Sequence, residues 1–374
     1  MGLLILSASD VDQATSKFTP DELVDLMAKV FTNLSRNTQE AKEGAEGVCI
    51  PHRGTILSSN HRVLFMPSRL SAIGTAIKIV SVPTPSAPAD ARERGLPAST
   101  MVIDDRTGEV TAVINARKLT ALRNAASSLL ASQLFVPPLC PSGSSPRVLV
   151  AVGAGAQIAA HLSLFLSSYP SITVCKIYNR SANARLHSLV ESLKAMHPSV
   201  QSTGVALPND TDGENLVEKQ QFSDAIRSAD IIVTATSSTV PLFPSSYVSP
   251  GTLLCLIGSY TPVMHEIDTD LVKRGGTIVV DYKAGALAEA GELIKADVGP
   301  SDVLELGELI QTSNPALSRW APRIDMIERV RASGDVTIFK SVGVGIQDVA
   351  IAHAVVESAR KHCLGTVVDD YDSV

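Results

Sequence analysis

The sequence predicts an α/β fold whose main part is a Rossmann-type, doubly wound parallel sheet. The first observation is an apolar run over residues 148–152, which ends in Gly153-Ala154-Gly155 and passes at once into a helical pattern. The second is a series of similar runs, separated by helical patterns, which cover 172–178, 231–236, 253–257 and 277–281. Apolar runs of this length with helices between them are typical of parallel strands that are buried on both faces.

The glycine turn predicts a binding site for a dinucleotide. A strand, a tight turn and a helix in this order place free backbone N–H groups at the positive end of a helix dipole, where a pyrophosphate can bind. The residues expected at the cofactor here are Gly153, Gly155, Ala156 and Gln157. Ile158 stands where the usual fingerprint has its third glycine, so a corner of small residues that binds no ligand is an alternative.

The end of the second strand indicates which dinucleotide binds. Enzymes that prefer NAD usually carry an acid there, which binds the 2′-hydroxyl of the ribose, whereas those that prefer NADP offer an arginine to the 2′-phosphate. This chain has Asn179, Arg180 and Ser181 at that place and no acid. We therefore expect NADP(H) as the cofactor; the alternative is a solvated arginine in a surface turn.

The composition narrows the class of protein. A chain of 374 residues, 45% of them hydrophobic, predicts two domains with large cores. A net charge of −6 argues against a nucleic acid as partner. The five cysteines are scattered without a CxxC pair, which predicts free thiols in a reducing compartment, the cytoplasm, rather than a metal site or disulfides. No apolar run is long enough to span a membrane, and residues 1–7 are expected to form an opening strand.

Before the glycine turn, the sequence predicts a separate α/β part. A helix is expected over 18–36, where Thr19-Pro20-Asp21-Glu22 gives a start signal. An alanine-rich helical pattern follows later over 118–134, and the proline- and serine-rich residues 136–146 mark the crossing between domains. Strands are expected between the two helices, the last two of them joined as a hairpin, over 62–67, 76–82, 100–105 and 110–114.

The end of the chain is expected to return to the first domain. Residues 336–340 predict a strand, and residues 348–360 predict a helix rich in Ala and Val that packs back onto the N-terminal part. The polar residues 204–221 are interpreted as a surface excursion. The predicted domains are therefore 1–134 plus 341–374, and 135–340.

Three basic residues of the N-terminal domain predict a site for a carboxylate. Arg53 follows Pro51-His52, Lys78 lies among apolar strand residues, and Arg123 lies in the alanine-rich helix. Strand alternation favours a Lys78 side chain that points away from the core. A buried cation needs a partner because its desolvation costs several kcal/mol, and arginine binds a carboxylate with a two-pronged fork. A substrate carboxylate is one such partner; a structural ion pair with an internal acid is the alternative.

Short segments along most of the chain share the pattern of one family. They are Phe65-Met66-Pro67, Lys78-Ile79-Val80, Asp105 through Gly108, Leu119-Thr120 with Arg123-Asn124-Ala125-Ala126, Gly153-Ala154-Gly155-Ala156-Gln157, Asn179-Arg180, Gly258 with Pro262 and Glu266, Ala288-Glu289-Ala290-Gly291-Glu292, and Phe339-Lys340-Ser341-Val342-Gly343 with Gln347-Asp348. On these segments the sequence resembles the ornithine cyclodeaminase/μ-crystallin family.

The resemblance implies an N-terminal α/β domain that binds substrate and forms a homodimer, and a Rossmann domain that binds NAD(P). It also implies an enzyme that acts on amino or imino acids, like the cyclodeaminases, alanine dehydrogenase, opine-type reductases and ketimine reductases of the family. Arg53, Lys78 and Arg123 match the positions that hold the substrate carboxylate. The further residues that we expect at the cofactor are Thr236, Gly258, Ser341 and Gly343.

One position departs from the pattern of the cyclodeaminases. They carry an aspartate before a small residue and a proline, where this chain has Tyr260 before Thr261-Pro262. A tyrosine, whose pKa is ordinarily about 10, is a poor general base at neutral pH, so cyclodeamination is not favoured. Reduction of a C=N bond needs an oriented imine, a positive environment and a proton donor, and Lys78 and Tyr260 are the catalytic candidates for that donor.

The predicted function is the NADPH-dependent reduction of a cyclic or linear imino acid to an amino acid. One alternative is an ornithine or lysine cyclodeaminase, which recycles NAD internally and releases ammonia. Another is a protein that binds NADPH and a small ligand without turnover. Net consumption of NADPH distinguishes the first from the other two. The expected partners are a small amino or imino acid that carries a carboxylate and a second copy of the chain, without nucleic acid or membrane.

Overall fold

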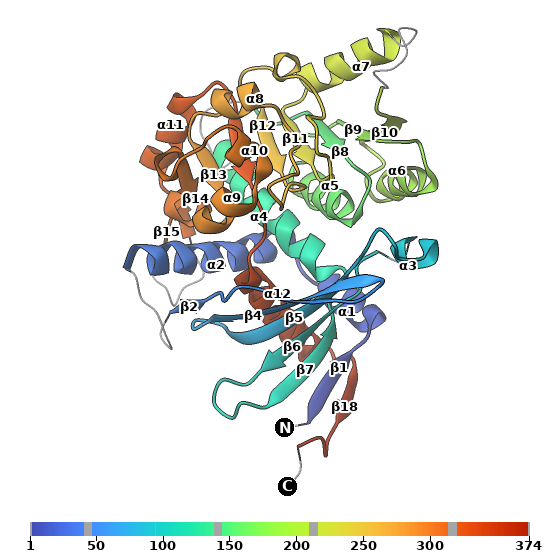
Figure 1. Cartoon of the computed structure of the whole chain (residues 1–374), viewed down its shortest axis with the longest axis vertical. Helices are drawn as coiled ribbons and strands as arrows, with labels where there is room; N and C mark the ends of the chain where they lie inside the picture. Colours follow the sequence, from blue (N-terminus) through green and yellow to red (C-terminus); the bar gives the residue numbers. More distant parts are fainter. Residues whose placement is uncertain are drawn as a thin grey trace. The chain divides into compact units, whose positions relative to one another are not determined.

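The computed structural model describes residues 2–40, 47–93, 95–137, 144–208, 216–312 and 320–372. Its contacts divide the chain into two compact units (Figure 1). Unit 1 comprises Met1–Arg123 and Val344–Val374, and unit 2 comprises Asn124–Gly343. The chain thus leaves unit 1 within a helix, earlier than the expected boundary after residue 134. Cys140 and most of the expected crossing over 136–146 lie outside the described residues.

Unit 1 is built on a mixed sheet with the strand order β18-β1-β7-β6-β5-β4-β2, in which β3 also pairs with β4. β1 and β7 are parallel, and the other neighbours are antiparallel. The strands are β1 (Leu3–Leu6), β2 (Val48–Cys49), β3 (Gly54–Leu57), β4 (His61–Leu70), β5 (Gly74–Pro83), β6 (Ala98–Ile103), β7 (Val110–Asn115) and β18 (Thr366–Val368). The N-terminal strands predicted from the sequence are present as β1, β4, β5, β6 and β7.

Helices of unit 1 cover one face of this sheet: α1 (Ala8–Thr15), α2 (Pro20–Glu40) and α12 (Gly345–Lys361). The short α3 (Ala89–Glu93) lies in the connection between β5 and β6. α12 contacts α1, α2, β4, β5 and β6, so the C-terminal helix completes a unit that begins at the N-terminus. α2 starts at a reciprocal cap: Glu22 accepts a hydrogen bond from the Thr19 N–H at 2.8 Å, and the Thr19 hydroxyl accepts one from the Glu22 N–H at 3.2 Å.

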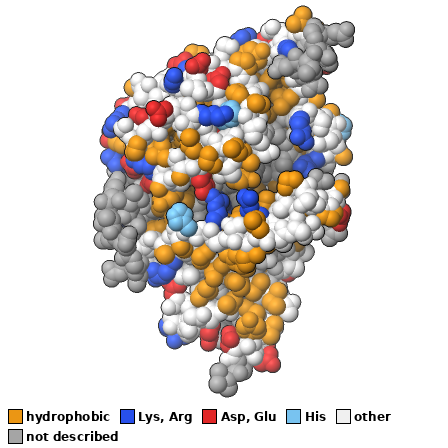
Figure 2. All heavy atoms as spheres, in the orientation of Figure 1, with side chains coloured by type: hydrophobic (Ala, Val, Ile, Leu, Met, Phe, Trp, Pro, Cys, Tyr) orange, Lys and Arg blue, Asp and Glu red, His pale blue; other side chains and the backbone are white. Residues whose placement is uncertain are grey.

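The two faces of the sheet of unit 1 carry different side chains. On β5, Ala76 and Lys78 are buried on the face that α12 covers, whereas Ile77 and Ile79 are half-buried on the other face. Figure 2 shows hydrophobic side chains gathered over the strands of this unit. Strand pairing aligns an apolar row on this second face across β1, β7, β6, β5 and β4, which consists of Ile5, Val113, Met101, Ile77 and Pro67 and ends beside Thr366 of β18.

Unit 2 contains the predicted parallel sheet, with the strand order β10-β9-β8-β11-β12-β17-β13-β14. The order reverses beside β8, between β9 and β11, as it does in doubly wound sheets. The strands are β8 (Val148–Val152), β9 (Val174–Asn179), β10 (Gln201–Ala206), β11 (Ile231–Thr234), β12 (Leu253–Leu256), β13 (Ile278–Val280), β14 (Val303–Glu305) and β17 (Thr337–Lys340). All pair in parallel, which confirms the predicted fold class.

The other elements of unit 2 connect these strands and flank the sheet (Figure 1). The helices are α4 (Leu119–Phe135, which begins in unit 1), α5 (Ala156–Ser168), α6 (Ala184–Met196), α7 (Leu216–Arg227), α8 (Thr269–Arg274), α9 (Lys283–Glu289), α10 (Gly291–Lys295) and α11 (Ile324–Ser333), with 3₁₀ turns at Ser245–Tyr247, Pro300–Asp302 and Leu306–Leu309. β15 (Ile310–Thr312) and β16 (Trp320–Pro322) form a separate antiparallel pair.

The expected surface excursion over 204–221 was wrong at both ends. Residues up to Ala206 belong to β10, and residues from Leu216 belong to α7, while 209–215 lie outside the described residues. β10 is an edge strand that pairs only with β9, and most of its side chains are exposed. A strand at a sheet edge needs few apolar residues, which explains why its composition resembled a loop.

The described helices include none that is long and apolar enough to cross a membrane. The described cysteines are free: Cys175 and Cys255 are buried in β9 and β12, and Cys49 and Cys363 are exposed. In the same part of the chain, His, Cys, Asp and Glu side chains form no group that could hold a metal ion.

A buried polar contact joins α4 and α5. His161 is fully buried, its Nε2 lies 2.9 Å from the hydroxyl of Ser128, and its Nδ1 lies 2.7 Å from the carbonyl oxygen of Gln157. Since a carbonyl only accepts hydrogen bonds, Nδ1 carries the proton and Nε2 accepts from Ser128. Burial lowers the pKa of His161 to about 4, so this histidine is neutral in the folded protein at neutral pH.

His161 predicts a loss of stability in mild acid. The pKa of a histidine in an unfolded chain is about 6.5, so the unfolded state binds the proton at a higher pH than the folded state. Above that pH this histidine leaves the free energy of unfolding unchanged; between about pH 6.5 and 4 it lowers it, by at most about 3 kcal/mol. Thermal denaturation at falling pH measures the effect, which His161→Gln removes. The exposed His187→Gln should behave like the wild type, and an unchanged pH dependence in His161→Gln would contradict the prediction.

Candidate functional site

The glycine turn of unit 2 lies at the carboxyl end of β8, where the strand order reverses. Gly153 has a φ of +119°, and a Cβ there would lie 2.9 Å from the carbonyl oxygen of Ala235, so the turn requires glycine. Gly155 is the N-cap of α5 and offers no side chain to the first N–H groups. A Cβ on Gly155 would meet nothing within 4 Å. The N-terminus of α5 is therefore open to an anion at the positive end of the helix.

Ile158 takes over the packing role of the missing third glycine. It is fully buried, and its Cγ1 lies 3.2 Å from the place that a Cβ on Gly153 would occupy. The absence of a side chain at Gly153 thus makes room for a large one at position 158. Ala156 and Gln157 precede it at the start of α5, and Oε1 of Gln157 is buried without a hydrogen-bond partner. Such an orphaned acceptor fits a site that is completed by a ligand.

A pocket of about 950 Å³ lies at this end of the sheet of unit 2. Its walls come from the glycine turn, the end of β9 and the segment 235–244 after β11. The volume lies within the range of cofactor sites. The predicted cofactor residues that line it are Gly153, Gly155, Asn179, Arg180, Ser181 and Thr236.

Basic side chains line the pocket together with the end of β9. Arg180 is joined there by Arg185 of α6 and Lys219 of α7. Asn183, between the two arginines, caps α6 by accepting a hydrogen bond from the Leu186 N–H at 3.1 Å. Asp268 adds one negative charge to the lining, so these basic side chains still leave the pocket positive, which favours an anionic ligand, and arginine in particular suits a phosphate.

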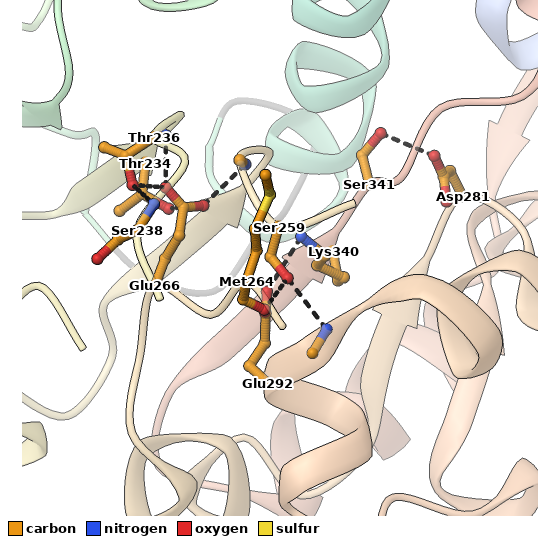
Figure 3. Close-up of polar contacts among 12 residues, drawn as sticks. Thr234, Thr236, Ser238, Ser259, Met264, Glu266, Asp281, Glu292, Lys340 and Ser341 are labelled. Carbon is orange, nitrogen blue, oxygen red and sulfur yellow. Dashed lines mark hydrogen bonds and ion pairs between the residues drawn. The ribbon is translucent and has the colours of Figure 1, made fainter. Parts of the chain in front are cut away.

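The other four residues expected at the cofactor lie at the same edge of the sheet. Thr236 and Gly258, after β11 and β12, both bond to the buried carboxylate of Glu266 (Figure 3). Ser341 and Gly343, after β17, both donate to Oδ2 of Asp281, at 2.7 Å each. Of these four, Thr236 lines the pocket, while Gly258, Ser341 and Gly343 are not among its lining residues.

Tyr260 lies in the loop after β12, is 42% exposed and does not line the pocket. The base of its loop is fixed. The hydroxyl of Ser259 donates to the carbonyl oxygen of Met264 at 2.6 Å and accepts from the Gly291 N–H at 3.0 Å (Figure 3). The loop therefore projects Tyr260 from a rigid base into an exposed position.

Unit 1 contains a buried cluster of two cations and one acid. Asp348, at the start of α12, accepts a hydrogen bond from Nζ of Lys78 at 2.6 Å and lies 3.3 Å from Nε of Arg123. A second arm of Arg123 donates to the side-chain oxygen of Gln347. Each of the three charged side chains is at most 5% exposed. The expectation that Lys78 points away from the core was wrong, because α12 covers that face of the sheet and supplies Asp348.

The charges in this cluster shift one another's pKa values. Burial lowers the pKa of Lys78; Asp348 opposes this shift, and Arg123 and Arg53 add to it. Burial raises the pKa of Asp348, but Arg123 and Lys78 outweigh burial and hold it below its ordinary value. Arg53 is exposed and acts on Lys78 through its charge. Of the three cations predicted as a group, Lys78 and Arg123 therefore share one acid, and Arg53 acts on Lys78 through its charge.

Three residues of these two sites were not predicted from the sequence to have a role there. Asp348 and Gln347 belong to a segment that matched the family pattern, but their contact with Arg123 joins residues far apart in the chain. Arg185 was missed because a helix places it in the pocket beside Arg180. Its position two residues after the Asn183 cap was the available signal.

Comparison with known sequences gives one clear family. The sequence profile of the ornithine cyclodeaminase/mu-crystallin family matches residues 21–362. The chain is 27% identical over 261 residues to "Ketimine reductase mu-crystallin" of Rattus norvegicus, covering 70% of this chain and 69% of that protein. It is 29% identical over 279 residues to "Delta(1)-pyrroline-2-carboxylate reductase" of Colwellia psychrerythraea, covering 72% of this chain and 77% of the relative.

Comparison with solved structures supports the fold. The structure of Thermococcus litoralis Delta(1)-pyrroline-2-carboxylate reductase in complex with NADH and L-proline superimposes with a TM-score of 0.74. The match covers 98% of this chain and 100% of that one, at 23% sequence identity. The two chains therefore share their architecture along their whole length.

Proposed function

The chain belongs to the ornithine cyclodeaminase/mu-crystallin family, and on this premise we propose that it is a nicotinamide-dependent enzyme that reduces the C=N bond of an imino acid. The relatives named above support the reaction class, since they reduce ketimines or pyrroline-2-carboxylate by name. The observation that carries the proposal is the buried cluster of Lys78, Arg123 and Asp348, in which two cations converge on one acid while the charge of Arg53 acts on the same lysine. A site of this kind suits the carboxylate of a substrate.

The pocket of unit 2 fits a dinucleotide. The uncapped start of α5 and the open space at Gly155 suit a pyrophosphate. The orphaned oxygen of Gln157, which is not among the lining residues, is an acceptor and suits a hydroxyl group such as that of a ribose. Gly153, Ala156 and Thr236 complete the proposed cofactor site, with Gly258, Ser341 and Gly343 at the neighbouring strand ends. When bound, the reduced cofactor supplies the hydride for the imine carbon.

The residues of unit 1 bind the substrate and supply a proton. Arg123 and Arg53 bind the carboxylate, and the fixed geometry of Arg123 on Asp348 and Gln347 orients it. Nζ of Lys78 holds the proton that passes to the imine nitrogen, which becomes the amine of the product. Burial favours this role, because it lowers the pKa of Lys78 and makes the ammonium a stronger acid. Tyr260, exposed in its loop, is then not required as the donor.

We expect Arg123→Ala to lose most of the activity. The test is NADPH oxidation at 340 nm with five- and six-membered cyclic imino 2-carboxylates. Charge-assisted hydrogen bonds to a carboxylate are worth about 3 kcal/mol, so kcat/KM should fall by about 100-fold or more. Arg117→Ala, at an exposed arginine just before α4, is the matched control and should keep the activity.

Two further results would decide between the candidate reactions. The variant Tyr260→Phe should keep an activity within a few-fold of the wild type. An inactive variant would identify Tyr260, rather than Lys78, as the proton donor. Ammonia release from ornithine or lysine without net NADPH consumption would overturn the reductase in favour of a cyclodeaminase. Tight binding of NADPH without turnover of any imine would favour a binding protein.

The preferred cofactor is NADP(H). Arg180 and Arg185 line the pocket beside Asn179 and Ser181, and no acid follows β9 to receive a ribose 2′-hydroxyl. A 2′-phosphate meets two guanidinium groups there, each able to donate two hydrogen bonds. Lys219 adds positive charge to the same pocket.

The double variant Arg180→Ala/Arg185→Ala should separate the two cofactors. Loss of the phosphate contacts should raise the Kd for NADPH by about 10- to 100-fold, since hydrogen bonds between charged groups are worth about 1.5–3 kcal/mol. The Kd for NADH should stay within about two-fold, because NADH lacks the phosphate. Fluorescence titration without substrate measures both, and Arg329→Ala, on the exposed side of α11, is the control. An equal loss for both cofactors would contradict the NADP(H) preference.

The protein is proposed to act as a homodimer in the cytoplasm. The apolar row on the sheet face opposite α12 supports self-association, because its side chains remain partly exposed in the described structure and apolar sheet faces are normally covered. The free thiols support a reducing compartment. Sedimentation equilibrium tests the assembly: twice the 39.4 kDa mass of the chain is expected, and the chain mass itself would refute the dimer.

A further inference from the structure

Glu266 is a buried carboxylate that joins the ends of two strands of unit 2. It is fully buried in the loop between β12 and α8 (Figure 3). Its Oε2 accepts from the Thr234 hydroxyl at 2.7 Å and from the Gly258 N–H at 2.8 Å. Its Oε1 accepts from the N–H and hydroxyl of Thr236, at 2.7 and 2.8 Å. Each oxygen therefore holds one backbone N–H from a different strand end.

The same residue also fixes the far end of the loop after β11. The backbone oxygen of Glu266 accepts from the Leu242 N–H at 2.8 Å, and the neighbouring His265 donates its N–H to Ser238 at 2.9 Å. The segment Thr236–Leu242 is thus clamped at its start by the Glu266 side chain and at its end by the Glu266 backbone. All residues of this segment line the dinucleotide pocket.

The pocket wall formed by Thr236–Leu242 is closely packed, so its position depends on the Glu266 side chain that holds it. A Cβ on Gly258 would lie 2.0 Å from the oxygen of Thr236 and 2.5 Å from Oε1 of Glu266. The ends of β11 and β12 therefore touch with only a glycine between them, and the carboxylate fills the remaining space. The hydrogen bonds from Glu266 therefore help to set the backbone position at Thr236 and Gly258.

A gain in the stability of the folded protein does not explain why a buried carboxylate stands at position 266. Burial raises its pKa; Lys340 and the bonds from Thr234 and Thr236 oppose the rise, and Glu292 adds to it. Lys340 is itself paired with Glu292, at 3.0 Å. A buried charge is weak evidence for stability, since well-packed apolar residues stabilise a core at least as well. What a carboxylate supplies here, and an apolar residue cannot, is two acceptors for two backbone N–H groups.

We propose that Glu266 is a positioning residue for cofactor binding, which holds the ends of β11 and β12 in the arrangement that forms one wall of the dinucleotide pocket. The inference rests on the proposed function only in that this pocket takes a nicotinamide dinucleotide. It assigns Glu266 no contact with the cofactor or the substrate. Glu266 affects cofactor binding through the position of Thr236 and of the segment Thr236–Leu242.

The geometry predicts that glutamine cannot replace Glu266. An amide offers one acceptor oxygen and one NH₂ group, which only donates. In either orientation the NH₂ group faces a backbone N–H, that of Thr236 or that of Gly258. Glu266→Gln should therefore raise the Kd for NADPH by about 10-fold or more, the effect of one unsatisfied buried donor. The Kd for NADH should rise equally, because this wall is shared by both dinucleotides.

Glu292→Gln is the matched control. Glu292 is as buried as Glu266 and pairs with Lys340, but it makes no hydrogen bond to the pocket wall in the described structure. Fluorescence titration without substrate should give a Kd within about two-fold of the wild type for this variant. Thermal unfolding of both variants without cofactor shows how far each loses stability. Unchanged binding in a folded Glu266→Gln, or equal weakening in Glu292→Gln, would overturn the inference.

Thr234→Val decides the case if Glu266→Gln does not fold. Thr234 is fully buried, does not line the pocket, and its hydroxyl bonds only to Glu266 among the described contacts. The variant keeps the shape of the side chain and removes one of the four bonds. A rise of about three-fold in the Kd for both dinucleotides is expected, and no change would overturn the inference. A wild-type protein that binds neither dinucleotide would overturn the proposed function as well, which separates the two failures.

Discussion

The structure of unit 2 depends on one constraint: buried parallel strands end together at one edge of the sheet. Because their interior residues are apolar on both faces, polar groups are confined to the ends. β8, β11, β12 and β17 are neighbours, so the residues after each of them meet at one place although the chain separates them widely. The glycine turn, Thr236, Gly258 and Ser341 occupy that edge. A ligand site at the switch point follows from this arrangement.

The backbone N–H groups at these strand ends need hydrogen-bond acceptors, and buried carboxylates supply such acceptors. Glu266 accepts from the ends of β11 and β12, and Asp281 accepts from Ser341 and Gly343 after β17. These acids do not compete with a ligand for the start of α5. They fix the backbone around the start of α5. The N–H groups of that helix N-terminus and the arginines after β9 can therefore bind an anion.

Local features of the sequence predicted local structure well. The glycine turn, the apolar strands and the cap of α2 depend on residues within a few positions of one another, so their patterns were sufficient. Other features depended on contacts between distant residues. The place of β17 between β12 and β13 cannot be read from the chain order, and the direction of Lys78 is set by α12. Ile158 looked like a defect of the fingerprint until its contact with Gly153 was seen.

The two units surround their buried carboxylates with different groups, and the difference bears on the proposed function. In unit 2, backbone and hydroxyl groups donate to Glu266 and Asp281, and the Lys283 N–H donates to Glu305. Glu292 is held differently: it forms an ion pair with Lys340, but its two oxygens are buried without a hydrogen-bond partner. In unit 1, Asp348 is the acid that faces both Lys78 and Arg123, and Arg53 adds a further positive charge nearby. Two cations thus converge on one carboxylate, an arrangement that suits a further anion, and the carboxylate of an imino acid is the anion proposed for it.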